Sequence, residues 1–298
     1  MGTRRLLASA LVHMSNNRAK ARQRDETKWN RAALLRRRKY MIFETHAHYD
    51  DERYNEDRDA LLRHLPEEGV GVVINSGASV ESTRDTIRLA REYDHVYAAV
   101  GVHPSEIAEL DEAFMEWMRE QASWEKTVAI GEIGLDYYWD KEPEVQEKQR
   151  YWFGRQIELA RETGLPIIVH SRDAAADTMQ VMKEHHAEEI PGVIHCFSYS
   201  KEMALEFIKM GYYIGVGGVV TFKNAKKLIE TVEAIPLERI LLETDCPYMA
   251  PEPYRGKRNN SLYLTYVRDK IAEIKGISPE EVERVTEENA RILFSKVR

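Results

Sequence analysis

The feature that most constrains the fold of this chain is a regular alternation of short β-rich segments with longer amphipathic segments, which begins at Met41. The short segments are apolar and rich in Val and Ile, as strands are when both faces of a parallel sheet are covered. Eight of them are predicted, at residues 41–46, 70–75, 96–102, 127–133, 166–170, 193–196, 213–216 and 240–245. This order of elements predicts an α/β fold with a parallel sheet.

Helices are expected between and after these strands, at residues 79–92, 144–163, 201–210, 223–234, 262–275 and 279–296. The 258 residues from 41 to 298 match the usual size of a (β/α)8 TIM barrel, which is about 250 residues. The alternative is an open doubly wound sheet, which usually has a Gly-rich loop after its first strand. Here the first strand ends in His46–Ala47–His48 instead, so we predict a barrel that forms a single domain.

Residues 1–40 differ in charge from the rest of the chain. They hold 12 Lys or Arg and 2 Asp or Glu, a net charge of +10, whereas residues 41–298 hold 31 and 48, a net charge of −17. The apolar run at 6–12 is too short for a secretory signal and is followed by further basic residues. We predict a basic, poorly ordered N-terminal extension, with Met41 starting the folded domain. A targeting segment and a nucleic-acid-binding arm are the alternatives.

The composition excludes several classes of protein. With 43% hydrophobic residues the chain can bury a large core, so it is not a disordered protein. No run approaches the ~18 apolar residues of a transmembrane helix, so we predict no membrane association. Cys196 and Cys246 are too few for a disulfide framework, which favours a reducing compartment and a cytoplasmic location. The acidic domain argues against coating of nucleic acid through global positive charge.

Histidine and carboxylate side chains gather where six of the predicted strands end. They are His46, His48, His103, Glu132, His170, His195 and Asp245. Active sites of (β/α)8 barrels lie at the C-terminal ends of the strands, so these side chains are expected at one mouth. Their convergence predicts a metal centre. We place His103 beside the substrate rather than on a metal.

The residue types suit metal-assisted hydrolysis. Positions i and i+2 of a strand face the same side, so His46 and His48 present two imidazoles to one ion. Glu132 can bridge two ions through its two oxygens, and the later histidines add nitrogen ligands. Two ions can polarise a phosphoryl oxygen and generate a hydroxide nucleophile. Asp245 supplies an oxygen ligand and is a candidate general base.

Each of these residues also has a structural interpretation when it is taken alone. A single histidine or glutamate at a strand end is more often a packing or loop-binding residue, and Asp245 before a Cys-Pro pair could cap a turn. Convergence at one end of the barrel favours the metal centre. Cys196 and Cys246 directly follow predicted ligands, and consecutive strand residues point to opposite faces. We therefore expect both cysteines to pack in the core, with metal ligation as the alternative.

Six motifs in order resemble the TatD family of metal-dependent deoxyribonucleases. They are FETHAH at 43–48, GVHP at 101–104, GEIGLDY at 131–137, HCFS at 195–198, LETDCPY at 242–248 and PYRGKRN at 253–259. The resemblance runs from Met41 to about Phe294 and does not cover residues 1–40. It implies an amidohydrolase-like barrel with two divalent metal ions, Mg, Mn or Zn. One ion would be held by His46, His48 and Asp245 and the other by His170 and His195, with Glu132 between them.

The activity that the resemblance implies is hydrolysis of DNA, commonly 3′→5′ exonucleolytic cleavage of single strands. The residues expected to contact the substrate are His103, Arg172, Phe197, Lys223, Arg255, Lys257 and Arg258. The basic ones suit phosphate groups, although a solvated charged loop is the alternative. Phe197, Tyr199 and Tyr254 are candidate stacking surfaces, with ordinary rim packing as the alternative. Tyr199 replaces a glycine common in the family and is expected to narrow the mouth or add a stacking surface.

Three functions remain open from the sequence. The leading hypothesis is a two-metal phosphodiesterase that acts on DNA as a monomer. The second is a hydrolase of small amide, ester or phosphoester substrates on the same barrel, against which the basic loop argues mildly. The third is a nucleic-acid-binding factor that does not cleave, against which the intact ligand set argues.

Overall fold

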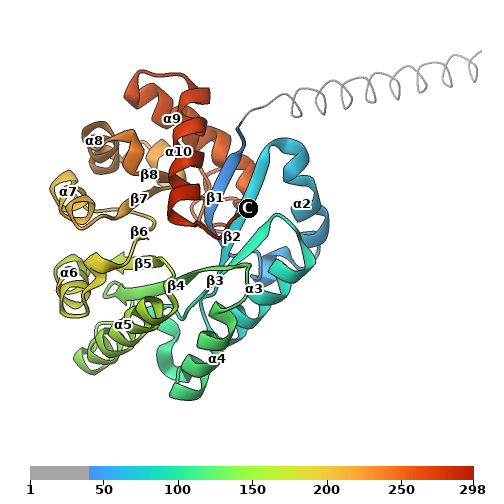
Figure 1. The fold of residues 1–298 in the computed structure, drawn as a ribbon. Coiled ribbons are helices and arrows are strands. Elements are labelled where there is room, and N and C mark those ends of the chain that lie inside the picture. Colours follow the sequence, from blue (N-terminus) through green and yellow to red (C-terminus); the bar gives the residue numbers. More distant parts are fainter. Residues whose placement is uncertain (1–39) are drawn as a thin grey trace, which may run out of the picture. The chain divides into compact units, whose positions relative to one another are not determined.

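The computed structural model describes residues 40–298, so the predicted extension lies, except for Tyr40, outside the described residues. The described chain forms one eight-stranded sheet whose strands follow chain order and pair in parallel (Figure 1). The strands are β1 (Ile42–Ala47), β2 (Val70–Ser76), β3 (Val96–Val100), β4 (Thr127–Asp136), β5 (Ile167–Arg172), β6 (Gly192–Ile194), β7 (Tyr213–Val216) and β8 (Ile240–Leu242).

The sheet closes on itself where the end of β1 meets the turn after β8. Ala47 forms a parallel bridge with Cys246. The amide of Asp245 donates to the carbonyl of His46 at 3.0 Å, and the amide of His48 donates to the carbonyl of Cys246 at 2.8 Å. This seam completes a (β/α)8 barrel and confirms the predicted fold class.

Helices surround the ring of strands on its outside (Figure 1). The α-helices are α2 (Arg58–His64), α3 (Val80–Glu92), α4 (Glu112–Ala122), α5 (Pro143–Thr163), α6 (Ala175–Glu184), α7 (Lys201–Lys209), α8 (Lys226–Ala234), α9 (Leu264–Lys275) and α10 (Pro279–Leu293). Short 3-10 turns occupy Glu52–Tyr54, Pro66–Glu68, Pro104–Glu109, Ala187–Glu189, Gly218–Thr221, Leu237–Arg239 and Ser261–Tyr263. Within residues 40–298, none of the helices combines the length and the apolar character that a membrane crossing requires.

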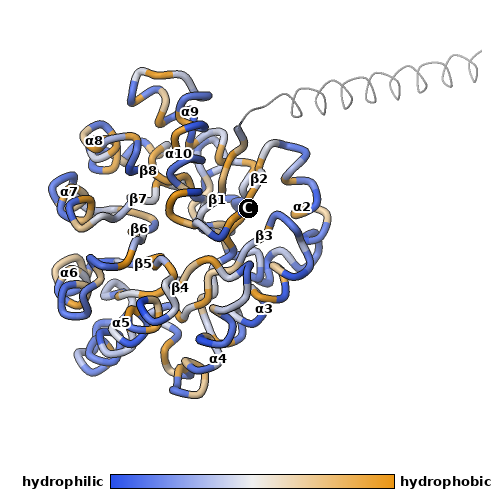
Figure 2. The backbone as a smooth tube through the Cα atoms, in the orientation of Figure 1, coloured by the Kyte–Doolittle hydropathy of each residue, from blue (hydrophilic) through white to orange (hydrophobic). Residues whose placement is uncertain are grey.

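Local sequence explains where several helices begin and end. The side chains of Ser79 and Asp111 accept hydrogen bonds from backbone amides of the first turns of α3 and α4, as N-caps do. Gly164 and Gly276 follow α5 and α9 in the left-handed conformation that glycine adopts without steric cost. Figure 2 shows the consequence for packing, with largely hydrophobic strands surrounded by helices that alternate between hydrophobic and hydrophilic residues.

The inside of the barrel is closed at one end by the C-terminal segment. One hydrophobic cluster contains side chains from all eight strands together with Leu293, Phe294 and Val297. The rings of Phe43 and Phe294 stack with centroids 6.0 Å apart. We call these three C-terminal side chains, Leu293, Phe294 and Val297, the plug of the barrel. Because the plug fills the interior at this end, a substrate can reach the barrel only from the opposite mouth, where the strands end.

Seven of the eight strands end one to three residues away from the predicted position. β8 stops at Leu242, where its pairing with β7 ends, and β6 stops at Ile194. Asp245 and Cys196, which the prediction places inside these strands, have φ angles of 56° and 45°, which a strand cannot continue through. β4 continues to Asp136 because it stays paired with β5 as far as Arg172.

Replacing Phe294 with alanine should destabilise the protein by about 3–5 kcal/mol, because a fully buried ring would leave a cavity under the barrel. Urea unfolding followed by circular dichroism measures this loss. Ile292→Ala is the matched control, since Ile292 is 69% exposed and should change stability by less than about 0.5 kcal/mol. Equal effects of the two substitutions would contradict the role of the plug.

Candidate metal centre

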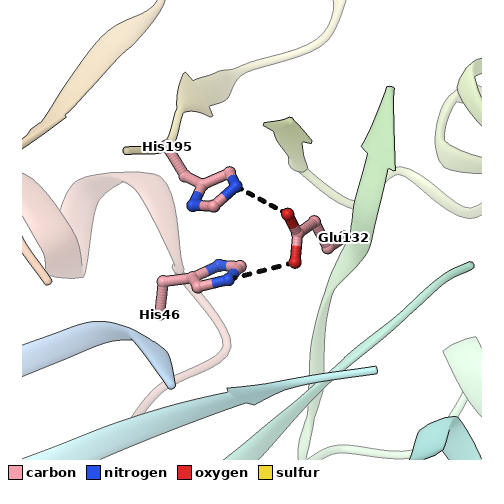
Figure 3. A group of neighbouring side chains, drawn as sticks. All are labelled: His46, Glu132 and His195. Atoms are coloured by element: carbon pink, nitrogen blue, oxygen red, sulfur yellow. Dashed lines mark ion pairs between the residues drawn. The ribbon is translucent and has the colours of Figure 1, made fainter. Parts of the chain in front are cut away.

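Glu132 on β4 stands in the middle of a group of imidazoles at the open mouth and is almost completely buried. Its Oε1 lies 2.6 Å from Nε2 of His195 and 2.8 Å from Nδ1 of His170. Its Oε2 lies 3.2 Å from Nε2 of His46 and 3.4 Å from Nε2 of His48. Figure 3 shows the rings of His46 and His195 stacked one above the other, with each ring reaching a different oxygen of Glu132. The two oxygens therefore face different pairs of histidines.

His46, His48 and Asp245 form one side of the cluster, at the seam of the barrel. The Nε2 atoms of the two histidines are 3.0 Å apart, and Oδ1 of Asp245 lies 3.5 Å from Nε2 of His48. Nδ1 of His48 lies 2.9 Å from the carbonyl oxygen of Ser76. A carbonyl only accepts, so Nδ1 carries a proton. Burial would lower the pKa of His48, but hydrogen bonds with Asp245 and Glu132 raise it well above its usual value. Loss of the proton on Nε2 would leave a lone pair there, beside two carboxylates. A cation between these atoms would satisfy all of them.

His170 and His195 form the other side. Nδ1 of His170 lies 3.1 Å from Nε2 of His195, and Nε2 of His170 lies 3.1 Å from Oδ2 of Asp136. Nδ1 of His195 is buried and has no hydrogen-bond partner within residues 40–298. His103 also belongs to this side, with its Nε2 3.7 Å from Oε1 of Glu132. His103, which we expect to contact the substrate, therefore lies directly against the ligand cluster.

The buried carboxylate and imidazole groups of the cluster shift one another's pKa values. Burial alone would raise the pKa of Glu132, but His195 and His46 hold that pKa well below its usual value. Burial and the nearby His195 lower the pKa of His46 to about 4. Burial would also lower the pKa of His170, but hydrogen bonds with Asp136 and Glu132 raise it to about 9. An anionic Glu132 and a neutral His46 are the forms that bind a divalent cation.

The donor atoms fit a divalent cation. Three overlapping groups have ligand atoms within 4.8 Å of one another, namely His46–Glu132–His195, His46–His48–Asp245 and His103–Glu132–His170. Mixed nitrogen and carboxylate donors of this kind bind divalent metals such as Zn²⁺ and Mn²⁺. The structure thus brings all six predicted ligands into one cluster. It does not divide them into two sites, since the first group combines histidines from both.

Two buried carboxyl groups support the ligands, and the sequence analysis gave them no role. Glu44 accepts hydrogen bonds from the amide of His46 at 3.2 Å, from the amide of Thr244 at 2.8 Å and from the hydroxyl of Ser261 at 2.8 Å. Glu243 accepts one from the amide of Cys196. Burial raises the pKa of Glu44 to about 7 and that of Glu243 to about 8. The signal that marks both is an acid inside an apolar strand segment, two residues from a predicted ligand.

Gly134 explains part of the GEIGLDY motif. Its φ is 148°, and a Cβ atom placed there would lie 1.9 Å from the carbonyl oxygen of His170. Only glycine lets β4 lie this close to β5, which fixes Glu132 against His170.

A cavity of about 1010 Å³ lies above the cluster. Five of the six predicted ligands line it, and His46 lies beneath them. His103, Arg172 and Phe197, three of the residues expected to contact the substrate, are also on its wall. Lys223, Arg255 and Lys257 are exposed but do not line the cavity. Arg255 stacks its guanidinium 4.3 Å from the ring centroid of Phe222, which does line it.

Several expectations for individual side chains differ from what the structure shows. Arg258 is bound to Asp57 at 2.7 Å rather than free for phosphate, because this acid lies opposite it. Phe197 is only 2% exposed and has no free face for stacking. Tyr199 does not line the cavity, since its hydroxyl is hydrogen-bonded to Ser171 and to the amide of Ala174.

The two remaining expectations concern Tyr254 and the cysteines. Tyr254 stacks on Tyr263 with ring centroids 4.3 Å apart, which is packing between two aromatic side chains of the chain itself. Cys246 is buried as expected, but Cys196 lines the cavity because its positive φ turns the chain out of β6.

A (β/α)8 barrel with a histidine–carboxylate cluster at its mouth is the architecture of a metal-dependent hydrolase. The sequence profile described as TatD related DNase matches residues 43–295. The chain therefore belongs to the TatD family of metal-dependent hydrolases.

Individual relatives agree with this assignment. The chain is 44% identical over 254 residues to YabD of Bacillus subtilis, described as an uncharacterized metal-dependent hydrolase, and the alignment covers 85% of this chain and 99% of YabD. It is 36% identical over 257 residues to YcfH of Escherichia coli K12, with the same description, covering 85% and 96%. The crystal structure of YjjV, a TatD homologue from Escherichia coli K12, matches with a TM-score of 0.80 at 31% identity, covering 85% and 98%.

Replacing Glu132 with glutamine should remove bound divalent metal, because a neutral amide leaves the surrounding nitrogen atoms without their central anion. Elemental analysis after gel filtration measures the metal content. In the wild type, EDTA should also lower the unfolding temperature, since a metal at 100 times its Kd contributes about 2.7 kcal/mol, whereas the variant should not respond. Glu106→Gln, which lines the same cavity outside the cluster, is the control. Equal metal content in Glu132→Gln and the wild type would refute the assignment.

Proposed function

We propose that the protein hydrolyses phosphodiester bonds of single-stranded DNA, as a 3′→5′ exonuclease with two divalent metal ions. The observation that carries the proposal is Glu132, whose two oxygens face separate pairs of histidines. A carboxylate in this position can bridge two cations, and paired cations are suited to in-line displacement at phosphorus. The name of the matching family, TatD related DNase, agrees with DNA as substrate.

The six predicted ligands would hold the two ions in the following way. His46, His48 and Asp245 would bind one, His170 and His195 the other, and Glu132 both. When bound, the ions polarise a phosphoryl oxygen and lower the pKa of a water molecule. Mg²⁺, Mn²⁺ and Zn²⁺ are the candidates, and the nitrogen-rich set favours the latter two.

Asp245 is the residue that would accept the proton of the attacking water. It lines the cavity, and its side chain is 17% exposed. Burial would raise its pKa, but the contact with His48 and the nearby His195 lower it below the usual value. An ionised carboxylate facing the cavity can act as a base within hydrogen-bond reach of a bound water.

One observation favours the second candidate, a hydrolase of small esters or amides. Among the described residues that line the cavity, Arg172 is the only Lys or Arg, whereas Asp50, Asp51 and Glu106 are also present. A polyanion would therefore meet its positive charge at the rim, where Arg255 lies beside Phe222.

A direct test uses an oligonucleotide labelled at its 5′ end, incubated with Mg²⁺, Mn²⁺ or Zn²⁺. The wild type should produce a ladder that shortens from the 3′ end. Glu132→Gln should lose more than about 100-fold of this activity, because even outer partners of metal ligands contribute about 10- to 100-fold.

Glu106→Gln, purified in the same way, should retain activity and so exclude a contaminating nuclease. Equal cleavage by the wild type and Glu132→Gln would refute the proposal. Turnover of small esters or lactones without any cleavage of DNA would favour the second candidate instead.

A further inference from the structure

Two adjacent aromatic side chains stand exposed at the mouth of the barrel, directly after β4. Tyr138 is 42% exposed and Trp139 66% exposed. Trp139 lines the cavity together with Glu132 and His170. A tryptophan with most of its surface in water loses the free energy that burial would supply, so its position at the rim of a functional cavity indicates a ligand.

The turn that carries these rings is attached to the metal centre through Asp136. Its Oδ1 accepts hydrogen bonds from the amides of Tyr138 at 2.9 Å and Trp139 at 3.0 Å. Its Oδ2 lies 3.1 Å from Nε2 of His170. One carboxylate thus fixes both the aromatic turn and a predicted metal ligand, which sets the distance between the rings and the reacting atoms.

The guanidinium group of Arg172 packs against the rings of Tyr138 and Trp139. The guanidinium carbon of Arg172 lies 3.9 Å from the ring centroid of Tyr138 and 5.6 Å from that of Trp139. Tyr138 and Trp139 pack edge to face with centroids 4.8 Å apart. Arg172 also lines the cavity, so an aromatic face and a guanidinium are presented together to whatever enters. A flat base joined to a phosphate offers the complementary pair of groups.

We propose that Trp139, backed by Tyr138 and Arg172, forms a stacking subsite for one nucleobase of the DNA strand. The inference rests on the proposed function, because it takes the substrate of this centre to be a nucleic acid. The base stacks on the indole of Trp139, and Arg172 contacts the adjoining phosphate. Stacking tolerates every base, so the subsite recognises the presence of a base rather than its sequence.

The experiment combines Trp139→Ala with oligonucleotides in which a single abasic residue is moved stepwise from the 3′ end. On the intact strand, Trp139→Ala should raise KM about 5- to 100-fold with kcat little changed. Trp139→Phe should restore most of the loss. With the abasic residue at one particular position, the wild type should show the same weakened KM, and Trp139→Ala should add no further loss. Tyr151→Ala, an aromatic that is 54% exposed on α5 outside the cavity, is the matched control.

The same strands are also tested for equilibrium binding by fluorescence anisotropy, which separates the two proposals. If the wild type binds DNA with a Trp139-dependent preference for the intact strand but no metal supports cleavage, the subsite stands and the proposed hydrolysis fails. If the wild type cleaves DNA and Trp139→Ala leaves KM unchanged, or weakens intact and abasic strands equally, the subsite is refuted and the hydrolysis stands. If the wild type neither binds nor cleaves DNA, both are refuted.

Discussion

The negative charge of Glu132 is the constraint on which the rest of the mouth depends. A buried carboxylate is unfavourable unless positive charge and hydrogen-bond donors surround it. Here the surroundings are imidazoles from β1, β5 and β6 and their immediate continuations, and the pKa of His46 is lowered so far that this ring stays neutral. Burial would lower the pKa of His170, but hydrogen bonds with Asp136 and Glu132 raise it to about 9, so a proton on this ring offsets the anion when no metal is bound. A bound cation would take over that role, which links metal binding to the stability of the mouth.

Two other acids, Glu44 and Asp136, extend this pattern around the ligand cluster. Glu44 is satisfied by donors from β1, from the turn after β8 and from the loop before α9, and Asp136 joins β4 to His170. Each of these carboxyl groups contacts a predicted metal ligand, Glu44 through the backbone amide of His46 and Asp136 through the ring of His170. The polar residues at the strand ends thus form one connected network over an otherwise apolar barrel, and such a network holds ligands in place only while all of its members are satisfied.

The sequence predicted what depends on local pattern. Apolar runs located all eight strands, and the histidines and acids at the ends of six of them were expected at one mouth, because parallel strands in a barrel must end on the same side. It did not predict features that depend on distant partners. No feature of the sequence around Arg258 indicates its ion pair with Asp57, which is 201 residues away along the chain. Nor does sequence distinguish Phe197, whose ring is covered, from Trp139, whose ring is bare, because exposure is decided by the elements packed around each loop.

The seam between β1 and the turn after β8 has a consequence for how the chain is made. His46 and Asp245 are joined there by a backbone hydrogen bond, although one is near the start of the domain and the other near its end. During synthesis the ribosome must therefore release almost the whole domain before the two can meet. A nascent chain contains the histidines but not the assembled ligand cluster, so we expect it to bind a divalent metal with lower affinity than the folded domain. Closure of the barrel and assembly of the ligand cluster become a single late event, and a chain truncated before β8 retains neither.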